Sequence, residues 1–328
     1  MARPRFLPDR FTLALVTTVV FASVLPARGW GITFFDGLTT FAIGLLFFLH
    51  GARLSRPAIL AGIGHWRLHL LVFAATFGMF PLLGLALKPV LLPLIAGLGY
   101  TGILYLCVLP ATVQSAIAFT SIARGNVAAA VCSASASTLV GVFVTPPLVN
   151  LIVLPQGSAH SMLDSIGRIL VQLLLPFVAG HLLRPWIGDW ITRRAHVLKF
   201  TDQGSILLVV YTAFSAAVIE GLWRQVSILT LLGLLVACAV ILALALFITT
   251  QLARRLGFSK EDEITIVFCG SKKSLASGIP MANVLFPAHA VGAAVLPLML
   301  FHQMQLMACA VIAQRYARRP QTQTQTPR

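Results

Sequence analysis

Residues 264–287 read ITIVFCGSKKSLASGIPMANVLFP, an apolar stretch that small polar residues and two lysines interrupt near its centre. The interruption, GSKKS at 270–274, carries Lys272 and Lys273 side by side. Charged side chains are costly in the middle of a bilayer, so a lysine pair there indicates a functional site. An opened helix at that depth is tolerated only where protein buries it or where it lines a wet cavity. We therefore expect an opened helix here, at the working site of a membrane protein.

The composition of the whole chain agrees with a membrane protein. Apolar residues make up 58% of the chain and charged residues 10%, against about 25% charged in soluble proteins. The alternating ten-residue segments of a transmembrane β-barrel are absent. We therefore expect an all-α polytopic membrane protein. Its net charge of +15 comes from basic residues in short connections between apolar runs, which argues against a nucleic-acid partner.

The five cysteines also lie inside apolar runs and show no CxxC spacing. They are Cys107, Cys132, Cys238, Cys269 and Cys309. Cysteines of this kind behave as small buried apolar residues, so we expect neither disulfides nor a metal site.

Hydropathy and length predict about ten transmembrane helices. They run over 11–27, 32–50, 68–87, 99–123, 127–153, 163–183, 204–221, 227–252, 264–286 and 290–313. The first follows a basic start, as a signal peptide would, but we expect it to be retained as a span. The tail at 320–328 is polar and low in complexity, so we expect it to be disordered. The chain, 1–328, is predicted to form a single membrane domain.

The distribution of Lys and Arg predicts the orientation. One side receives Arg3, Arg5, Arg10, Arg53, Arg56, Arg67, Arg124, Arg184, Arg193, Arg194, Lys199, Arg254, Arg255, Lys260, Arg315, Arg318, Arg319 and Arg328. The other side receives only Arg28, Lys88 and Arg224. Positive residues concentrate in the cytoplasm, so we expect a multi-pass protein of the cell inner membrane with both termini cytoplasmic.

The fourth and ninth spans resemble each other. Residues 107–126 read CVLPATVQSAIAFTSIARGN and residues 269–283 read CGSKKSLASGIPMAN. In both, an apolar strip meets a small polar cluster and apolar helix then resumes. Each is the fourth span of a group of five, and five is odd. The second group therefore enters the membrane in the opposite sense, which predicts inverted repeats over about 11–153 and 163–313.

Interrupted segments at matching positions of inverted halves indicate a transporter binding site near the midplane. The residues that we expect to line it are Gln114, Ser115, Ser135, Gly270, Ser271, Lys272, Lys273, Ser274, Ser277 and Gln303. The lysines would contact an anion, or one would alternate between charge states and replace a coupling cation. Alternatively, they snorkel to the cytoplasmic interface. The serines and glutamines could instead serve ordinary helix packing, and His302 and Gln305 could line the cavity as well as Gln303 does.

At these residues the chain resembles the bile acid:sodium symporter superfamily, in particular its bacterial branch related to the seventh human member of that solute-carrier family. Residues 269–286 are close to the most recognisable segment of that branch. SIARGN at 121–126, with the Ser-rich helix that runs to TPPL at 145–148, matches the fourth and fifth helices. The resemblance covers about residues 10–315. It implies ten helices in two inverted five-helix repeats, divided into a panel and a core, with broken crossing helices 4 and 9.

The resemblance further implies transport of organic anions, often with sodium, but the sodium ligands depart from the pattern. The position of the usual carboxylate holds Phe268, and the Gln-Asn pair that follows is Lys272-Lys273. Two hydroxyl-bearing positions in the fifth helix hold Ala130 and Ala134. Unit charges a few ångströms apart repel by several kcal/mol even at an effective dielectric constant of about 20, and hard cations need oxygen ligands. Sodium coupling through these positions is therefore in doubt, and no cofactor is expected.

Two functions remain open from the sequence. The favoured one is secondary active transport of a small organic anion, coupled to sodium or protons. The alternative is a membrane regulator of calcium or another ion, which keeps the transporter fold but has little flux of its own. GSKKS lacks the glycine register and preceding strand of a phosphate-binding loop, and no metalloprotease or serine-nucleophile motif is present, so we expect no enzyme. The expected partners are the lipid bilayer and the anion, and the oligomeric state stays open.

Overall fold

The computed structural model describes residues 10–53, 63–153, 167, 170–219, 221–225 and 227–319. Within these residues all regular secondary structure is helical. Six helices are long and apolar enough to cross a membrane by length and composition. They cover Trp30–Arg53, Trp66–Ala86, Val127–Val153, Phe200–Ile219, Ile228–Arg255 and Ala288–Ala317. The expectation of a polytopic helical membrane protein is confirmed.

Some predictions fall outside the described residues. These are the tail at 320–328, the start of the sixth span, and several basic residues used for the orientation, among them Arg3, Arg5, Arg56 and Arg328. The five cysteines are all buried, as predicted.

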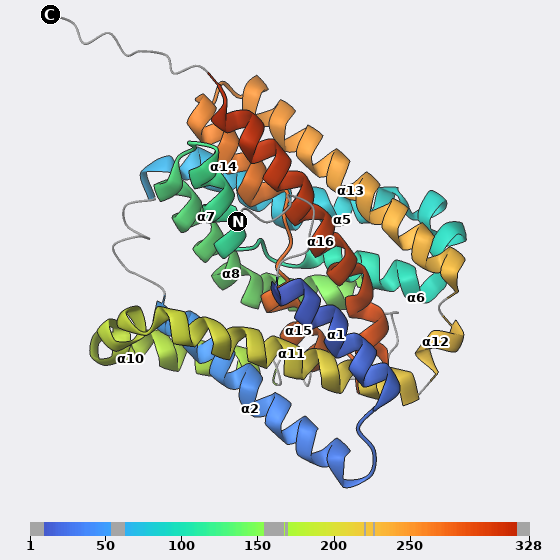
Figure 1. Cartoon of the computed structure of the whole chain (residues 1–328). Coiled ribbons are helices and arrows are strands. Elements are labelled where there is room, and N and C mark those ends of the chain that lie inside the picture. The colour runs from blue at the N-terminus through green and yellow to red at the C-terminus, as the bar shows by residue number, and fades with distance from the viewer. Residues whose placement is uncertain are drawn as a thin grey trace, which may run out of the picture.

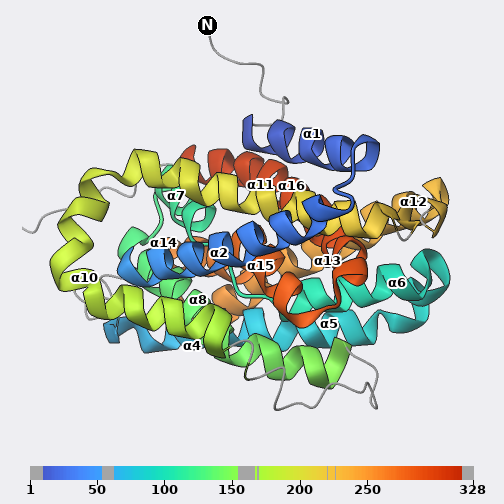
Figure 2. The same cartoon turned by 90° about the horizontal axis from the view of Figure 1, so that it is seen from below.

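Four helices pack into one layer, which we call the four-helix layer. It consists of α1 (Arg10–Val24), α2 (Trp30–Arg53), α10 (Leu175–Arg193) and α11 (Ala195–Ile219). Helix α10 runs beside α2, and α11 packs on both α1 and α2 (Figures 1 and 2). A side chain at Gly51 of α2 would collide with the carbonyl of Phe177. One at Gly180 of α10 would collide with that of Phe48. Small residues thus bring the two backbones into contact, as is common between membrane helices.

The remaining helices form a second group, which we call the crossing group. Its members are α4 (Trp66–Phe73), η2 (Ala74–Met79), α5 (Phe80–Ala86), α6 (Lys88–Val108), α7 (Gln114–Ile122), α8 (Val127–Leu148), η3 (Val149–Val153), α13 (Ile228–Arg255), α14 (Lys260–Gly270), α15 (Leu275–Leu285) and α16 (Ala288–Ala317). The short elements η1 (Ile63–His65), η4 (Leu170–Leu174) and α12 (Leu222–Gln225) complete the described part. Helix α11 packs against α15 and α16 and so joins the two groups.

Several helices of the crossing group begin behind a side-chain cap. Asn126 caps α8, Ser259 caps α14 and Ser274 caps α15, each accepting a hydrogen bond from the backbone N–H three residues further on. Such caps satisfy N–H groups that have no partner inside the helix. The first turn of α14 also carries three acidic residues, which favour the positive end of the helix dipole.

The helices are interrupted at the second predicted polar cluster, 271–274, and at a position that overlaps the first, 112–115. Helix α6 ends at Val108 and α7 begins at Gln114, which leaves a first break at 109–113. Helix α14 ends at Gly270 and α15 begins at Leu275, which leaves a second break at 271–274. The sequence placed the start of the fourth span at 99, but α6 already begins at Lys88. A proline in its first turn is compatible with helix there, since no N–H is needed.

A further irregularity near these breaks was not predicted. Residues 74–79 form η2, a π-helical turn between α4 and α5. Such turns shift the hydrogen-bond register and often occur at functional sites.

Candidate functional site

The two breaks lie against each other. The backbone N–H of Ser274 donates to the carbonyl of Pro110 at 2.9 Å, which links the second break to the first. The hydroxyl of Tyr105, on α6, donates to the carbonyl of Gly278, on α15, at 2.6 Å. A Cβ atom at Gly278 would lie 2.6 Å from a methyl group of Leu109. The broken helices therefore meet at backbone contact, far apart in sequence but adjacent in space.

A polar side chain from a later helix supports each break. In the first, the N–H of Ala111 donates to the hydroxyl of Ser137, on α8, at 3.1 Å. In the second, the side chain of Gln305, on α16, accepts from the N–H of Lys273 at 2.9 Å and donates to its carbonyl at 3.0 Å. These bonds satisfy backbone groups that the broken helices leave unpaired, which would be costly in a buried position.

The glutamine that holds the second break is Gln305, whereas the sequence favoured Gln303. Gln303 is half-buried, and Gln305 is fully buried. Gln305 continues the buried face of α16 defined by Leu298 and Phe301. The spacing of three and four residues on a buried face was the signal in the sequence that identifies it.

Both lysines are fully buried, at 0% exposure. They therefore do not snorkel to an interface, and that alternative is wrong. Within the described part of the chain, neither lysine forms an ion pair with a carboxylate. Two ammonium groups thus sit inside the protein beside the contact between the breaks. Burying a charge without a partner of opposite sign is expensive, which makes the pair unusual for a purely structural feature.

The ammonium of Lys273 lies among carbonyl oxygens, in what we call the carbonyl cage. It donates to the carbonyls of Thr76 at 2.7 Å, Cys107 at 2.8 Å and Leu109 at 2.7 Å. It also lies 4.2 Å from the ring centroid of Phe80, a distance typical of a cation–π contact. All three ammonium hydrogens are therefore used.

The ammonium of Lys272 lies in what we call the aromatic pocket. It is 4.6 Å from the ring centroid of Phe119, on α7, and 5.6 Å from that of Phe268, on α14. Its hydrogen bond is to the hydroxyl of Ser115 at 3.5 Å, which is long for a charged donor. That hydroxyl in turn donates to Thr112 at 2.9 Å. Lys272 therefore retains hydrogen-bonding capacity that Lys273 has spent.

The other predicted site residues divide into two sets. Gly270 ends α14, the hydroxyl of Ser271 bonds back to its own helix, and Ser274 and Ser277 form the cap of α15. Gln114 starts α7 and is exposed, while Ser135 is half-buried on α8. The structure thus brings Ser115 and residues 270–274 together.

The positions at which the resemblance places sodium ligands are apolar. Ala130, Ala134 and Phe268 are each 0% exposed and offer no side-chain oxygen. The ring of Phe268 packs against Phe119 and Tyr316. A hard cation finds no oxygen ligand from these side chains.

The cytoplasmic end predicted for α14 carries a charged cluster around Glu263. Its carboxylate accepts from Lys260 at 2.7 Å, Tyr316 at 2.8 Å and Arg254 at 3.3 Å. Burial alone raises the pKa of Glu263, but the hydrogen bonds from these three groups outweigh it and hold the pKa below its ordinary value. The cluster ties α13, α14 and α16 together beyond the apolar stretch.

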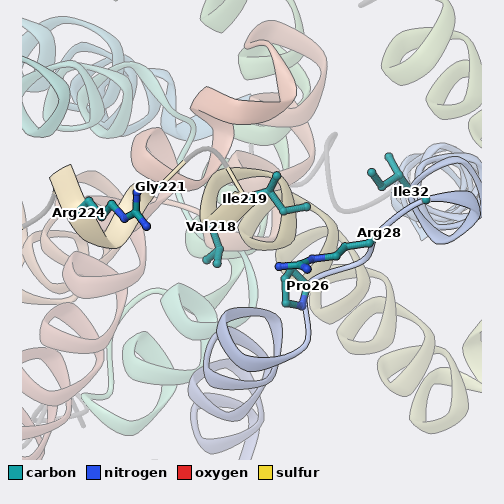
Figure 3. A pocket seen from close by; sticks show the side chains of 8 residues that line it. Pro26, Arg28, Ile32, Val218, Ile219, Gly221 and Arg224 are labelled. Carbon is teal, nitrogen blue, oxygen red and sulfur yellow. The ribbon is translucent and has the colours of Figure 1, made fainter.

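A separate cavity of about 580 Å³ lies at the turns that connect α1 to α2 and α11 to α12. Its lining includes Arg28, Val218 and Arg224, and Figure 3 shows the two arginines on either side of Val218. It shares no lining residue with the two breaks. The predicted site and this cavity are therefore distinct places in the molecule.

Comparison with known proteins supports the interpretation of this chain as a transporter. A model of the SBF-like CPA transporter family (DUF4137) matches residues 9–318. The chain belongs to the SBF-like CPA transporter family. It is 69% identical over 319 residues to an uncharacterised protein of Pseudomonas aeruginosa, PA2026, covering 97% of this chain and 96% of the relative. It is 60% identical over 314 residues to the putative symporter YfeH of Escherichia coli, covering 94% and 93%.

A more distant relative is the sodium/bile acid cotransporter 7 of Rattus norvegicus. The two are 27% identical over 282 residues, which cover 83% of this chain and 80% of the relative. The resemblance inferred from the sequence is thereby confirmed. The family is one of transporters, and the relatives with functional names are called a putative symporter and a cotransporter, not enzymes.

Proposed function

We propose that this protein is a secondary active transporter that moves a small organic anion across the cytoplasmic membrane. The observation that carries the proposal is the pair of buried lysines, which pair with no carboxylate among the described residues, beside the contact between two broken helices. A buried positive charge gains most from a ligand of opposite charge. Organic anions carry such a charge as carboxylate, sulfate or phosphate.

Lys272 is the residue that contacts the anion. Its ammonium has one long hydrogen bond, so it can donate to a ligand without giving up strong contacts. Ser115 adds a hydroxyl from the other broken helix, and Phe119 and Phe268 offer apolar surface for the organic part of the substrate. Because Lys272 is fully buried, the conformation described here is occluded. Access to the site then requires a movement of the surrounding helices.

The architecture proposed for this movement is two inverted repeats, at about 11–153 and 163–313. Packing supports it, because matching helices of the two halves make matching contacts. The contact of α1 with α11 corresponds to the contact of α10 with α2, if α1 matches α10 and α2 matches α11. In the same way, the contact of α5 with α6 corresponds to the contact of α13 with α14. The four-helix layer would act as the panel and the crossing group as the core. Motion of one against the other would expose the site to each side in turn, with both termini in the cytoplasm.

The coupling ion is sodium or a proton in this proposal. Sodium has precedent in the relative from Rattus norvegicus, which is named a sodium/bile acid cotransporter. The apolar side chains at Ala130, Ala134 and Phe268 favour the proton, since they offer no ligand to sodium. The regulator hypothesis gains no support, because the relatives with functional names are called symporters or cotransporters.

The test is uptake of radiolabelled organic anions by proteoliposomes that contain wild type, Lys272→Ala, or the double variant Lys272→Ala/Lys273→Ala. Lys260→Ala is the matched control, because Lys260 lies in the cluster of Glu263 and outside the site. We expect substrate-driven uptake with wild type and with Lys260→Ala, and a loss with Lys272→Ala. Equal uptake by all of these variants would remove the lysines from the mechanism.

A further inference from the structure

The carbonyl cage around Lys273 has the composition of a site for a monovalent cation. Its three oxygens lie 2.7, 2.8 and 2.7 Å from the ammonium nitrogen, within the range of charge-assisted hydrogen bonds. The ring of Phe80 adds a face that attracts positive charge. Rings of backbone carbonyls replace the hydration shell of monovalent cations in ion-selective proteins. None of the carboxylates in the described ranges takes part, so these oxygens carry no formal charge that would favour a divalent ion.

Irregular backbone supplies these carbonyls. Thr76 lies in the π-helical turn η2, Cys107 in the last turn of α6, and Leu109 at the start of the first break. The last carbonyls of a helix have no partner inside it and carry partial negative charge. Around this helix end, the carbonyl of Val108 is taken by Thr145 and that of Pro110 by Ser274. The carbonyls of Cys107 and Leu109 are thus left for a cation.

The number of donors and acceptors in the carbonyl cage indicates the protonation state of the Lys273 side chain. An ammonium has three donors and no acceptor, and it faces three oxygens that can only accept. A neutral amine has two donors, so one buried carbonyl would face a lone pair. The cage therefore matches an ammonium and not an amine.

We propose that the carbonyl cage is a monovalent-cation site whose resident cation is the ammonium of Lys273. The lysine acts as a tethered ion that joins η2 to the first break, and it is a positioning residue rather than a substrate contact. This inference goes beyond anion transport, since it holds whatever the protein carries. It implies that a free ammonium-type cation enters the cage once the side chain is shortened.

The first test is chemical rescue, measured as the melting temperature of purified protein. Lys273→Ala leaves both the cage and the space of the side chain open, whereas Lys273→Met fills the space without a charge. Each is titrated with ammonium and n-propylammonium chloride, against choline, sodium and potassium chloride at equal ionic strength. A ligand at ten times its dissociation constant raises the melting temperature of a protein of this size by about 2 to 4 °C.

We expect the amines to stabilise Lys273→Ala by about that amount, and to leave wild type and Lys273→Met unchanged relative to choline. Stabilisation by sodium or potassium instead of amines would still support a cation cage. No cation-dependent shift in Lys273→Ala, or the same shift in all three proteins, would overturn the proposal.

A second measurement uses wild type and stands even where Lys273→Ala does not fold. The chain has only five lysines, at 88, 199, 260, 272 and 273, so ¹⁵N-lysine labelling gives a simple side-chain spectrum. Lys273→Arg assigns the signal by its loss. We expect a protected ammonium signal for Lys273 at neutral pH. A neutral amine at that position, or exchange as fast as that of Lys260, would contradict a caged ammonium.

Discussion

The carbonyl cage and the aromatic pocket hold two neighbouring lysines of equal burial in opposite ways. Lys273 gives each of its hydrogens to a carbonyl within 2.8 Å, whereas Lys272 has one hydroxyl at 3.5 Å and two rings. Equal burial therefore does not mean equal function. We propose that Lys273, whose donors are all used, fixes the geometry of the break, and that Lys272 remains available to a ligand. The number of unused hydrogen-bond donors, rather than burial alone, indicates whether a buried lysine can bind a ligand.

The largest expected effect is on stability, from Lys273→Met. The substitution leaves three buried carbonyls without their donor, and an unsatisfied buried group costs about 1 to 3 kcal/mol. We expect a loss of several kcal/mol, measured by thermal or denaturant unfolding in detergent. Lys272→Met is the matched control and should cost little, since it removes one long hydrogen bond together with a buried charge. Equal losses in the two variants would remove the distinction between the two environments.

The next effect is on transport, from Lys272→Met. Removing one partner of a buried charge pair costs about 2 to 5 kcal/mol, which is more than tenfold in affinity. We expect anion uptake to fall by at least that factor while the folded protein is retained. Phe119→Leu should show a smaller loss, because it removes only one ring face from the pocket. The variants are compared by initial rates in proteoliposomes, and an unchanged rate for Lys272→Met would count against the anion contact.

A third comparison concerns the side chains that support the two breaks. Gln305→Leu removes two hydrogen bonds to the backbone of Lys273, and Ser137→Ala removes one to the N–H of Ala111. Each orphaned group costs about 1 to 3 kcal/mol, so we expect Gln305→Leu to destabilise about twice as much. Unfolding midpoints measure this. A greater loss of stability in Ser137→Ala than in Gln305→Leu would contradict this expectation and show that the hydrogen bond at the first break contributes more to stability.

The smallest effect is a pH dependence at the cluster of Glu263, which lies away from both lysine sites. Its pKa is lowered in the folded state, so its stabilising contribution is complete above the unfolded value of about 4.3 and is lost as the pH falls through the folded value. We expect wild type to melt above Glu263→Gln at pH 7, and this difference to shrink below pH 4. A difference that stays constant over the same range would contradict the assignment.

Periodicity and composition were enough to predict the membrane class, six of the long helices and both breaks. The sequence located the interruptions from small polar clusters within apolar stretches, at 112–115 and 271–274. The second cluster coincides with the break at 271–274, whereas the first overlaps the break at 109–113 only in part, because α7 already begins at Gln114. The cage could not be predicted, because it consists of main-chain oxygens that have no signature in the sequence. The π-helical turn that supplies Thr76 was missed for the same reason. Gln305 could have been predicted from the sequence, since it continues the buried face of α16.

The central claim is that Lys272, and not Lys273, meets the transported anion. The most direct test is the melting temperature of wild type, Lys272→Met and Lys273→Met against a panel of organic anions at varied sodium and pH, since a ligand of the folded state stabilises it. We predict at least one anion that stabilises wild type and loses this effect in Lys272→Met. Folded Lys273→Met should retain it. An anion that stabilises Lys272→Met as strongly as wild type would contradict the account.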